Sequence, residues 1–198
     1  MAQCVIYIPG LGDMAARNRY SESVGLKPWK LLGLNTYYFP LSWADKEPFE
    51  PKFKRLLTKI DQLQGQGNQV SLVGVSAGAS AAINAYAQRK DLNAVVLICG
   101  KIQNPQTVNR HYYIDNPAFE DSLATVAQSL ESLGKKERAH IMSIHPIWDN
   151  TVPVKDTKID GTKTKTVPVF GHIPGIFYSV TVASPAIAKF LKNPPQTA

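Results

Sequence analysis

The chain has 198 residues, of which 44% are hydrophobic and 19% charged, with a formal net charge of +7. This length fits one globular domain with a sizeable core and is too short for two typical domains, so we expect a single domain over residues 1–198. The basic residues are dispersed and no nucleic-acid readout motif accompanies them, so we expect no nucleic-acid partner. No apolar run approaches the roughly 18 residues of a membrane span, so none is expected.

The N-terminus and the two cysteines indicate the compartment. Met1 to Val5 lacks the basic stretch of a signal peptide and enters a strand pattern at once, which favours a cytoplasmic protein. Cys4 and Cys99 both lie in apolar strand patterns. We therefore expect two small buried side chains and no disulfide. Neither cysteine has the spacing of a metal site.

The first half of the chain alternates short apolar runs with amphipathic segments. Apolar and β-branched runs ended by Pro or Gly predict strands, whereas apolar residues three and four apart predict helices. The predicted strands are Val5–Ile8, Thr36–Phe39 and Gln69–Val73. The predicted helices are residues 16–33, interrupted near Gly25 and Pro28, then Pro51–Leu63 and Ala79–Ala87.

The second half continues this alternation. Strands are predicted at Leu92–Cys99, Ala139–Ile144 and Thr164–Phe170. One helix is predicted over Phe119–Leu133 with Gly134 as its stop, and another over Ser184–Leu191. Residues 193–198 are predicted to be a frayed tail. Residues 101–117 are predicted to form a loop.

Strands that alternate with helices of this length predict an α/β fold with a mostly parallel sheet covered by helices on both faces. Ligands in such sheets bind beyond the carboxyl ends of the strands. Each catalytic residue is therefore expected just after a strand.

The segment Gly74 to Gly78 has the pattern G-x-S-x-G. A serine at a sharp turn between a strand and a helix has its Oγ exposed above the sheet edge. The N-terminus of the following helix favours developing negative charge. The pattern alone also occurs by chance in Gly- and Ser-containing loops, but its position after a strand and before a helix favours Ser76 as a nucleophile.

A serine nucleophile needs a base, and the base needs a group that orients it. Asp149 follows the predicted strand Ala139–Ile144 and a short turn, and His172 follows the strand that ends at Phe170. Asp115 is the alternative acid. His145 precedes Asp149, which is the wrong order for the base, so a structural or pocket-lining role is favoured for it.

With these residues in place, the chain resembles a compact member of the α/β-hydrolase superfamily without a cap domain. The order Ser76, Asp149, His172 is similar to that family's order of nucleophile, acid and histidine. The resemblance implies that the loop after the first strand donates one oxyanion-hole N–H, which by position is that of Leu11. Proline stands at position 9, where a histidine often sits. Ala77 would supply the second N–H.

The expected function is hydrolysis of a carboxylic ester, or of a thioester or amide, through an acyl-enzyme intermediate. It needs a small-molecule ester and no metal or organic cofactor. A non-enzymatic binding module and an acyltransferase are the alternatives. Candidate walls of the substrate site are Trp43, Tyr112, Trp148 and Ile176. Asp13 is expected to hold the backbone near Leu11, and Asp156 to be solvated. The residues do not define an oligomeric state.

Overall fold

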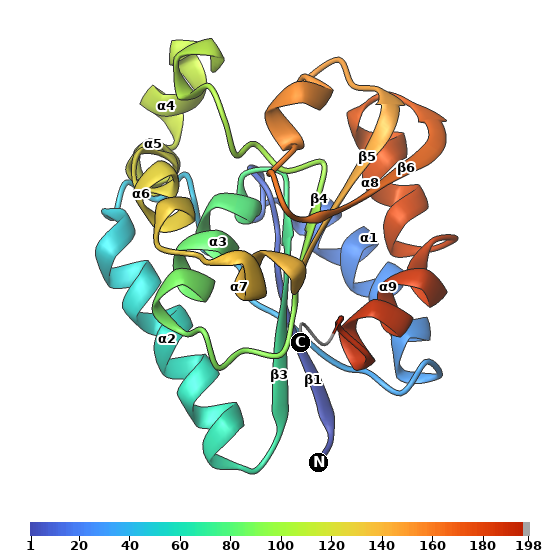
Figure 1. Cartoon of the computed structure of the whole chain (residues 1–198). Helices are drawn as coiled ribbons and strands as arrows, with labels where there is room; N and C mark the ends of the chain where they lie inside the picture. The colour runs from blue at the N-terminus through green and yellow to red at the C-terminus, as the bar shows by residue number, and fades with distance from the viewer. Residues whose placement is uncertain (196–198) are drawn as a thin grey trace.

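The computed structural model describes residues 1–195 and contains one six-stranded sheet in which every neighbouring pair of strands is parallel (Figure 1). The strand order is β2-β1-β3-β4-β5-β6. The strands span β1 Gln3–Ile8, β2 Asn35–Tyr38, β3 Gln69–Val75, β4 Val95–Ile98, β5 Ile141–Trp148 and β6 Lys163–Phe170.

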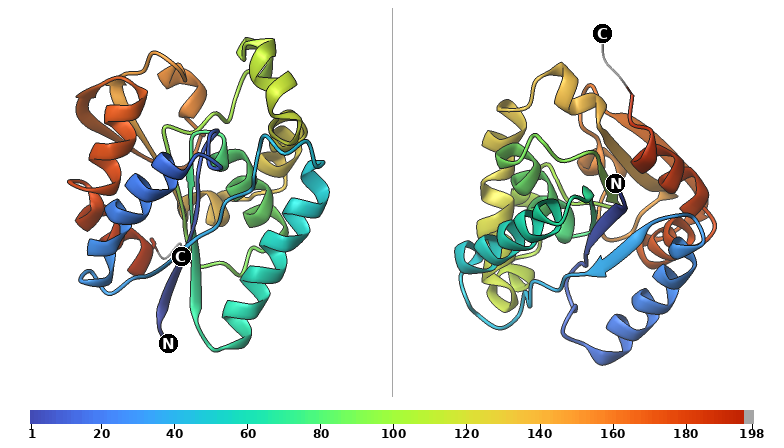
Figure 2. Two further views of the ribbon diagram at one scale, coloured as in Figure 1. Left: turned by 180° about the vertical axis from the view of Figure 1, so that it is seen from behind. Right: turned by 90° about the horizontal axis from the view of Figure 1, so that it is seen from below.

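Helices cover both faces of this sheet, as two further views also show (Figure 2). One face carries α2 Phe49–Gly65, α3 Gly78–Gln88, α5 Pro117–Ala124 and α6 Val126–Glu131. The other carries α1 Ala16–Leu26, α8 His172–Val180 and α9 Ser184–Lys192. Shorter elements are α4 Arg110–Asp115, α7 Lys135–Ala139 and the 3-10 turns Lys27–Lys30, Pro105–Thr107 and Val154–Thr157.

The core forms two layers because successive residues of each central strand point to opposite faces. Leu72 of β3 belongs to the layer under α2 and α3, whereas its neighbour Val73 belongs to the layer under α9. Both side chains are fully buried, as expected for a parallel strand covered on both faces. The apolar stripe of α2 packs on the first layer through Phe53, Leu56, Ile60 and Leu63.

The helix expected over 119–133 is broken into α5 and α6 at Thr125. The carbonyl of Ser122, which would accept an N–H in a continuous helix, instead accepts the Thr125 hydroxyl at 3.0 Å and the Asn84 side-chain amide at 2.8 Å. The expectation of one helix was therefore wrong, because side-chain donors replace a backbone donor there.

Two features near the C-terminal edges of the strands also differ from expectation. Residues 145–148, which were expected to form a turn, are the end of β5. Strand β4 pairs with β5 only as far as Ile144, so the missing N–H of Pro146 removes no hydrogen bond between these two strands. The segment after His172, for which no helix was predicted, is the helix α8. Pro174 is tolerated because it lies in the first turn, where backbone N–H groups have no intrahelical partner.

The segment 101–117 is a 3-10 turn followed by α4, where a loop was expected. Asp115, the alternative acid, ends α4 and is exposed. After α9 the chain has no regular structure over 193–195, and Nε2 of His140 lies 3.0 Å from the Pro195 carbonyl oxygen. The rest of the tail expected to fray, 196–198, lies outside the described residues.

Over residues 1–195, no one helix has both the length and the apolar character needed to cross a membrane. The bent pair α8 and α9, with an angle of 61° between them, passes that test only when the two helices are taken together.

Candidate active site

Ser76 sits at the turn between β3 and α3 with a positive φ of 51°, a left-handed conformation that non-glycine residues adopt only where their surroundings enforce it. Its backbone N–H donates to the Ile98 carbonyl at 2.9 Å. Gly78 makes the turn possible, because a Cβ at this position would overlap the carbonyl oxygen of Ile8 at the end of β1. The turn therefore brings Ser76 close to the loop that follows β1.

Asp149 directly follows β5, and its carboxylate is fully buried. One oxygen accepts the backbone N–H groups of Thr151 at 2.8 Å and Val152 at 2.9 Å. Burial is the largest influence on the Asp149 pKa and raises it, but hydrogen bonds from His172 and from these two N–H groups outweigh burial and leave the pKa below its ordinary value. The carboxylate is therefore ionised at neutral pH.

His172 is the first residue of α8, two positions after β6 ends. Its backbone N–H donates to the side-chain oxygen of Asn150 at 3.1 Å. Gly171 precedes it with a φ of 95°, and the Gly171 N–H donates to the Trp148 carbonyl at 2.7 Å. These bonds attach the start of α8 to the end of β5.

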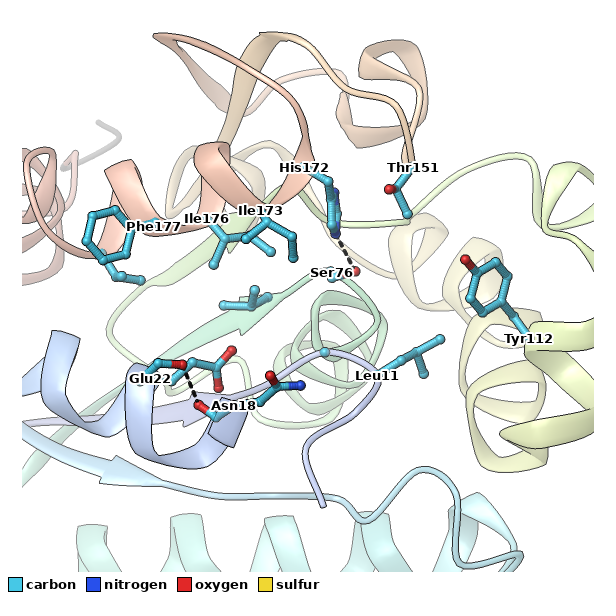
Figure 3. A pocket seen from close by; sticks show the side chains of 14 residues that line it. Leu11, Asn18, Glu22, Ser76, Tyr112, Thr151, His172, Ile173, Ile176 and Phe177 are labelled. Carbon is cyan, nitrogen blue, oxygen red and sulfur yellow. Dashed lines mark hydrogen bonds between the residues drawn. The ribbon is translucent and has the colours of Figure 1, made fainter. Parts of the chain in front are cut away.

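The structure brings Ser76, Asp149 and His172 together (Figure 3). Nδ1 of His172 lies 2.8 Å from Oδ2 of Asp149, and Nε2 lies 2.9 Å from Oγ of Ser76. The imidazole thus has a carboxylate on one nitrogen and a hydroxyl on the other. This arrangement can move a proton between the hydroxyl and the ring while the carboxylate holds the ring and its charge.

The loop after β1 lies beside the serine, held by buried polar contacts. Asp13 accepts the backbone N–H groups of Ser42 at 2.7 Å and Trp43 at 3.3 Å, and the Trp43 indole donates to the Pro9 carbonyl at 3.1 Å. Within the described chain, the backbone N–H groups of Leu11 and Ala77 donate no hydrogen bond. Both donors are thus free to bind a ligand oxygen next to Ser76.

Two cavities meet at Ser76. The first, called here the α1–α8 cavity, has a volume of about 320 Å³ and lies between side chains of α1 and α8. The second, called here the α4 cavity, has a volume of about 340 Å³ and lies between α4 and the segment 150–153. Leu11, Ser76, Tyr112 and Thr151 line both cavities.

The residues expected as substrate walls divide into two pairs. Tyr112 lines both cavities and Ile176 lines the α1–α8 cavity. Trp43 lines neither: it is fully buried, stacks on Phe49 and packs edge-on against Phe119. Trp148 also lines neither and is 57% exposed at the end of β5.

Several lining residues were missed by sequence reasoning. The α1–α8 cavity is also lined by Asn18, Ser21 and Glu22 of α1 and by Ile173, Phe177 and Val180 of α8. The apolar residues that follow His172 were the sequence signal for the α8 residues, but Pro174 and Gly175 among them are typical of a loop. His145 lies inside β5, is buried and lines neither cavity, and its Nδ1 is 2.9 Å from the Pro146 carbonyl oxygen.

Cys99 lies close beneath the same cluster. Its sulfur and the ligand atoms of Asp149 and His172 fall within 4.8 Å of one another, and all three residues are buried. Burial is the main cause that raises the pKa of the Cys99 thiol, with the Asp149 charge adding to it. Because a metal binds the thiolate, and Nδ1 of His172 is already hydrogen-bonded to Asp149, these residues fit a metal ion poorly.

Asp156, expected to be solvated, is instead fully buried. It pairs with the Nζ of Lys101 at 2.5 Å, and its backbone carbonyl accepts the N–H groups of Ile102 and Gln103, both at 3.1 Å. Lys101 follows β4 and Asp156 follows the Asp149 loop, so this pair joins the two segments. The expectation failed because the lysine partner lies 55 residues away in the sequence.

Neither the known protein-family models nor the curated proteins match this sequence. Solved structures do match in three dimensions. The esterase domain of a Rhodothermus marinus protein superposes with a TM-score of 0.69 at 13% identity, covering 95% of this chain and 87% of that one. A monoacylglycerol lipase of Paleococcus ferrophilus gives a TM-score of 0.61 at 14% identity, with coverages of 95% and 93%.

An α/β-hydrolase superfamily protein of Enterococcus faecalis gives a TM-score of 0.57 at 15% identity, covering 96% of this chain and 90% of that one. At these identities the likeness shows the fold. The chain therefore has the α/β-hydrolase fold that its sequence pattern predicted.

Proposed function

Starting from this fold and this site, we propose that the chain is a serine hydrolase that cleaves a carboxylic ester through an acyl-enzyme intermediate. Ser76 is the nucleophile, His172 the general base and acid, and Asp149 the carboxylate that orients the ring. The observation that carries the proposal is the pair of contacts on one imidazole, 2.9 Å to the Ser76 hydroxyl and 2.8 Å to the Asp149 carboxylate.

In the acylation step, Oγ of Ser76 forms a bond to the ester carbonyl carbon while its proton passes to Nε2 of His172. The carbonyl electron pair moves to oxygen, and the N–H groups of Leu11 and Ala77 bind that oxyanion. Backbone donors of this kind contribute about 3 kcal/mol each in comparable enzymes. When the carbonyl re-forms, the bond to the alcohol oxygen breaks and His172 gives its proton to the alcohol.

In the deacylation step, His172 takes a proton from water while the water oxygen bonds to the acyl carbon. The second tetrahedral intermediate then expels Oγ of Ser76, which receives the proton back from His172. The products are one carboxylic acid and one alcohol. The ionised, hydrogen-bonded Asp149 stabilises the imidazolium in both steps.

The two cavities support an ester with a substituent on each side of the carbonyl. Both are lined by Ser76, so the acyl part and the alcohol part have separate places at the nucleophile. Esterases and lipases among the structural relatives agree with an ester substrate. Each cavity has the volume of a small ligand, and we propose small esters accordingly.

The decisive experiment combines a fluorophosphonate probe with turnover of p-nitrophenyl acetate. We expect the parent protein to be labelled and active, and Ser76→Ala to lose labelling. Turnover is expected to fall by about 10⁴-fold or more in Ser76→Ala and in His172→Ala, and by a comparable factor in Asp149→Asn. Ser132→Ala is the control, because Ser132 is an exposed serine at the end of α6 that lines neither cavity.

A parent protein that neither labels nor hydrolyses any ester would refute the proposal and leave a binding module on this fold. An acyltransferase would label equally well. Competing alcohols in the assay, followed by product analysis, separate the two enzymes, because only the transferase forms the new ester as its main product.

A further inference from the structure

The α1–α8 cavity has two walls of opposite character, which Figure 3 shows on either side of the space next to Ser76. Ile173, Ile176 and Phe177 project into it from α8, and these side chains are apolar. Asn18 and Glu22 project from α1 on the other side, one helical turn apart. A purely hydrocarbon acyl chain would leave this second wall without a matching group.

Glu22 is the unusual member of that wall. Its Oε2 is buried, so this oxygen faces the protein, where the Tyr38 hydroxyl is its hydrogen-bond partner. The Glu22 side chain also lines the cavity opposite the apolar wall of α8, so its other carboxyl oxygen is the one that a ligand can reach. A carboxyl group that faces an apolar wall beside a nucleophile calls for an explanation.

The surroundings of Glu22 disfavour its charged form. Burial is the main cause that raises the pKa of Glu22 to about 7, the Tyr38 hydroxyl partly opposes this rise, and the negative charge of Asp13 adds to it. Among the lining side chains that the structure describes, none is a lysine or arginine. The Glu22 carboxyl can therefore accept a hydrogen bond whether it is neutral or charged, and the nearby charge of Asp13 makes its surroundings negative.

We propose that Glu22 determines substrate specificity by accepting a hydrogen bond from a hydroxyl or ammonium group at the far end of an otherwise apolar acyl or alcohol chain bound in the α1–α8 cavity. This inference rests on the proposed function, because the chain is placed by attachment at Ser76. The α8 side chains contact the methylene groups of the substrate, and Glu22 binds its terminal donor. A terminal carboxylate or phosphate is disfavoured, because it would face Glu22 and the charge of Asp13.

The test compares esters that differ only at the chain end. The acyl pair is p-nitrophenyl 6-hydroxyhexanoate against p-nitrophenyl heptanoate, with p-nitrophenyl 6-aminohexanoate as the ammonium form. The alcohol pair is 6-hydroxyhexyl acetate against heptyl acetate, followed by pH-stat. The measured quantity is the discrimination ratio, kcat/KM of the donor-terminated ester divided by kcat/KM of its methyl-terminated partner.

We expect Glu22→Leu to lower this ratio by about tenfold for at least one pair, the size of one hydrogen bond to a buried group, through a fall in kcat/KM of the donor-terminated ester. Leucine matches the size of glutamate and adds no polar group. The matched control is Glu131→Leu, which removes an exposed carboxyl from α6 that lines neither cavity. Its ratio should equal that of the parent.

Turnover of p-nitrophenyl acetate and fluorophosphonate labelling distinguish failure of the proposed function from failure of the role proposed for Glu22. A parent that shows neither refutes the proposed function, and this inference with it. An active parent whose ratio is unchanged in Glu22→Leu refutes only the role of Glu22. Loss of fluorophosphonate labelling in Glu22→Leu would also count against the role, because it would mean that Glu22 supports Ser76 itself.

Discussion

The side-chain oxygen of Asn150 accepts the backbone N–H of His172 at 3.1 Å, so the residue beside the proposed acid anchors the helix that carries the proposed base. The same segment therefore sets the position of the ring twice, once through Asp149 on Nδ1 and once through Asn150 on the backbone. Neither contact involves the reacting atoms.

We expect Asn150→Ala to reduce kcat by about ten- to a hundredfold with little change in KM, because a displaced imidazole reacts slowly with an ester that is still bound. Asn150→Asp keeps an acceptor oxygen at the same place and should retain much of the rate. Steady-state kinetics on p-nitrophenyl acetate separates the two parameters. Equal losses in both variants, or a loss confined to KM, would contradict this positioning role.

The buried pair of Lys101 and Asp156 should respond strongly to loss of one partner. Asp156→Leu leaves the lysine charge buried alone and is expected to lower the free energy of unfolding by about 3 kcal/mol. The double variant Lys101→Met, Asp156→Leu should be less destabilised than that single variant. Chemical denaturation of the single variants and the double variant measures this coupling.

The exposed pair of Lys54 and Glu50 is the control, and Glu50→Gln should leave stability unchanged. If the two buried substitutions destabilised the double variant by the sum of their separate effects, the prediction would be contradicted.

The pH dependence of the stabilisation by Asp156 has a definite sign. Burial raises the Asp156 pKa, but hydrogen bonds from Lys101 and Asn104 outweigh burial and leave the pKa below its ordinary value. The stabilisation that the Asp156 carboxylate provides is therefore present above the ordinary carboxyl pKa and is lost as the pH falls through the lowered pKa of the folded state.

Gly78→Ala is expected to damage both stability and activity. A Cβ there would overlap the Ile8 carbonyl and lie 2.6 Å from that of Pro9, so the loop that carries Leu11 must shift away from Ser76. We expect a loss of about 2 kcal/mol or more in the free energy of unfolding, together with a lower kcat. Thermal unfolding and ester turnover report the two effects.

Gly65→Ala is the matched control, because nothing lies within 4 Å of a Cβ at the end of α2. It should be neutral or stabilising by up to about 1 kcal/mol, since alanine favours helix. If Gly78→Ala behaved in the same way, the close packing of the serine turn against β1 would be wrong.

Glu22 should make the folded protein less stable at high pH. Its pKa of about 7 lies above the unfolded value of 4.5, so the folded state holds the proton more tightly and stability falls as pH rises through this interval. Glu22→Leu should remove this slope and be more stable than the parent at pH 8 by up to about 3 kcal/mol.

Urea denaturation at pH 4 and pH 8 tests this, with Glu131→Leu expected to follow the parent at both values. Asp13 remains in the variant, and burial raises its pKa as well. A variant whose stability falls with pH as steeply as that of the parent would show that the slope belongs to Asp13.

Most of the fold was predictable because parallel strands buried on both faces leave plain apolar runs. Val95–Ile98 is such a run, and it forms the central strand β4. The break at Thr125 was not predictable, because it depends on Asn84, which lies in another helix. Helix α8 was not predicted, because Pro174 and Gly175 are typical of loops. In the structure both residues lie in the first turn of the helix, which packs on β5.

For the site, the strand-end rule placed Ser76, Asp149 and His172 at one edge of the sheet, and the structure brings their side chains into contact. The walls were harder to predict, because an aromatic residue such as Trp43 can equally fill a core. Glu22 gave no signal in the sequence, since its burial arises only when α1 packs beside β2 and α8.

The order of the parts along the chain has a consequence for biosynthesis. The turn at Ser76 and the loop at Leu11 belong to the first strands to be made, whereas Asp149 and His172 follow β5 and β6 near the end. A ribosome would therefore display the proposed nucleophile well before its activating partners have been translated. Any premature stop codon ahead of position 172 would yield a polypeptide that lacks the proposed base, even if its earlier part folds.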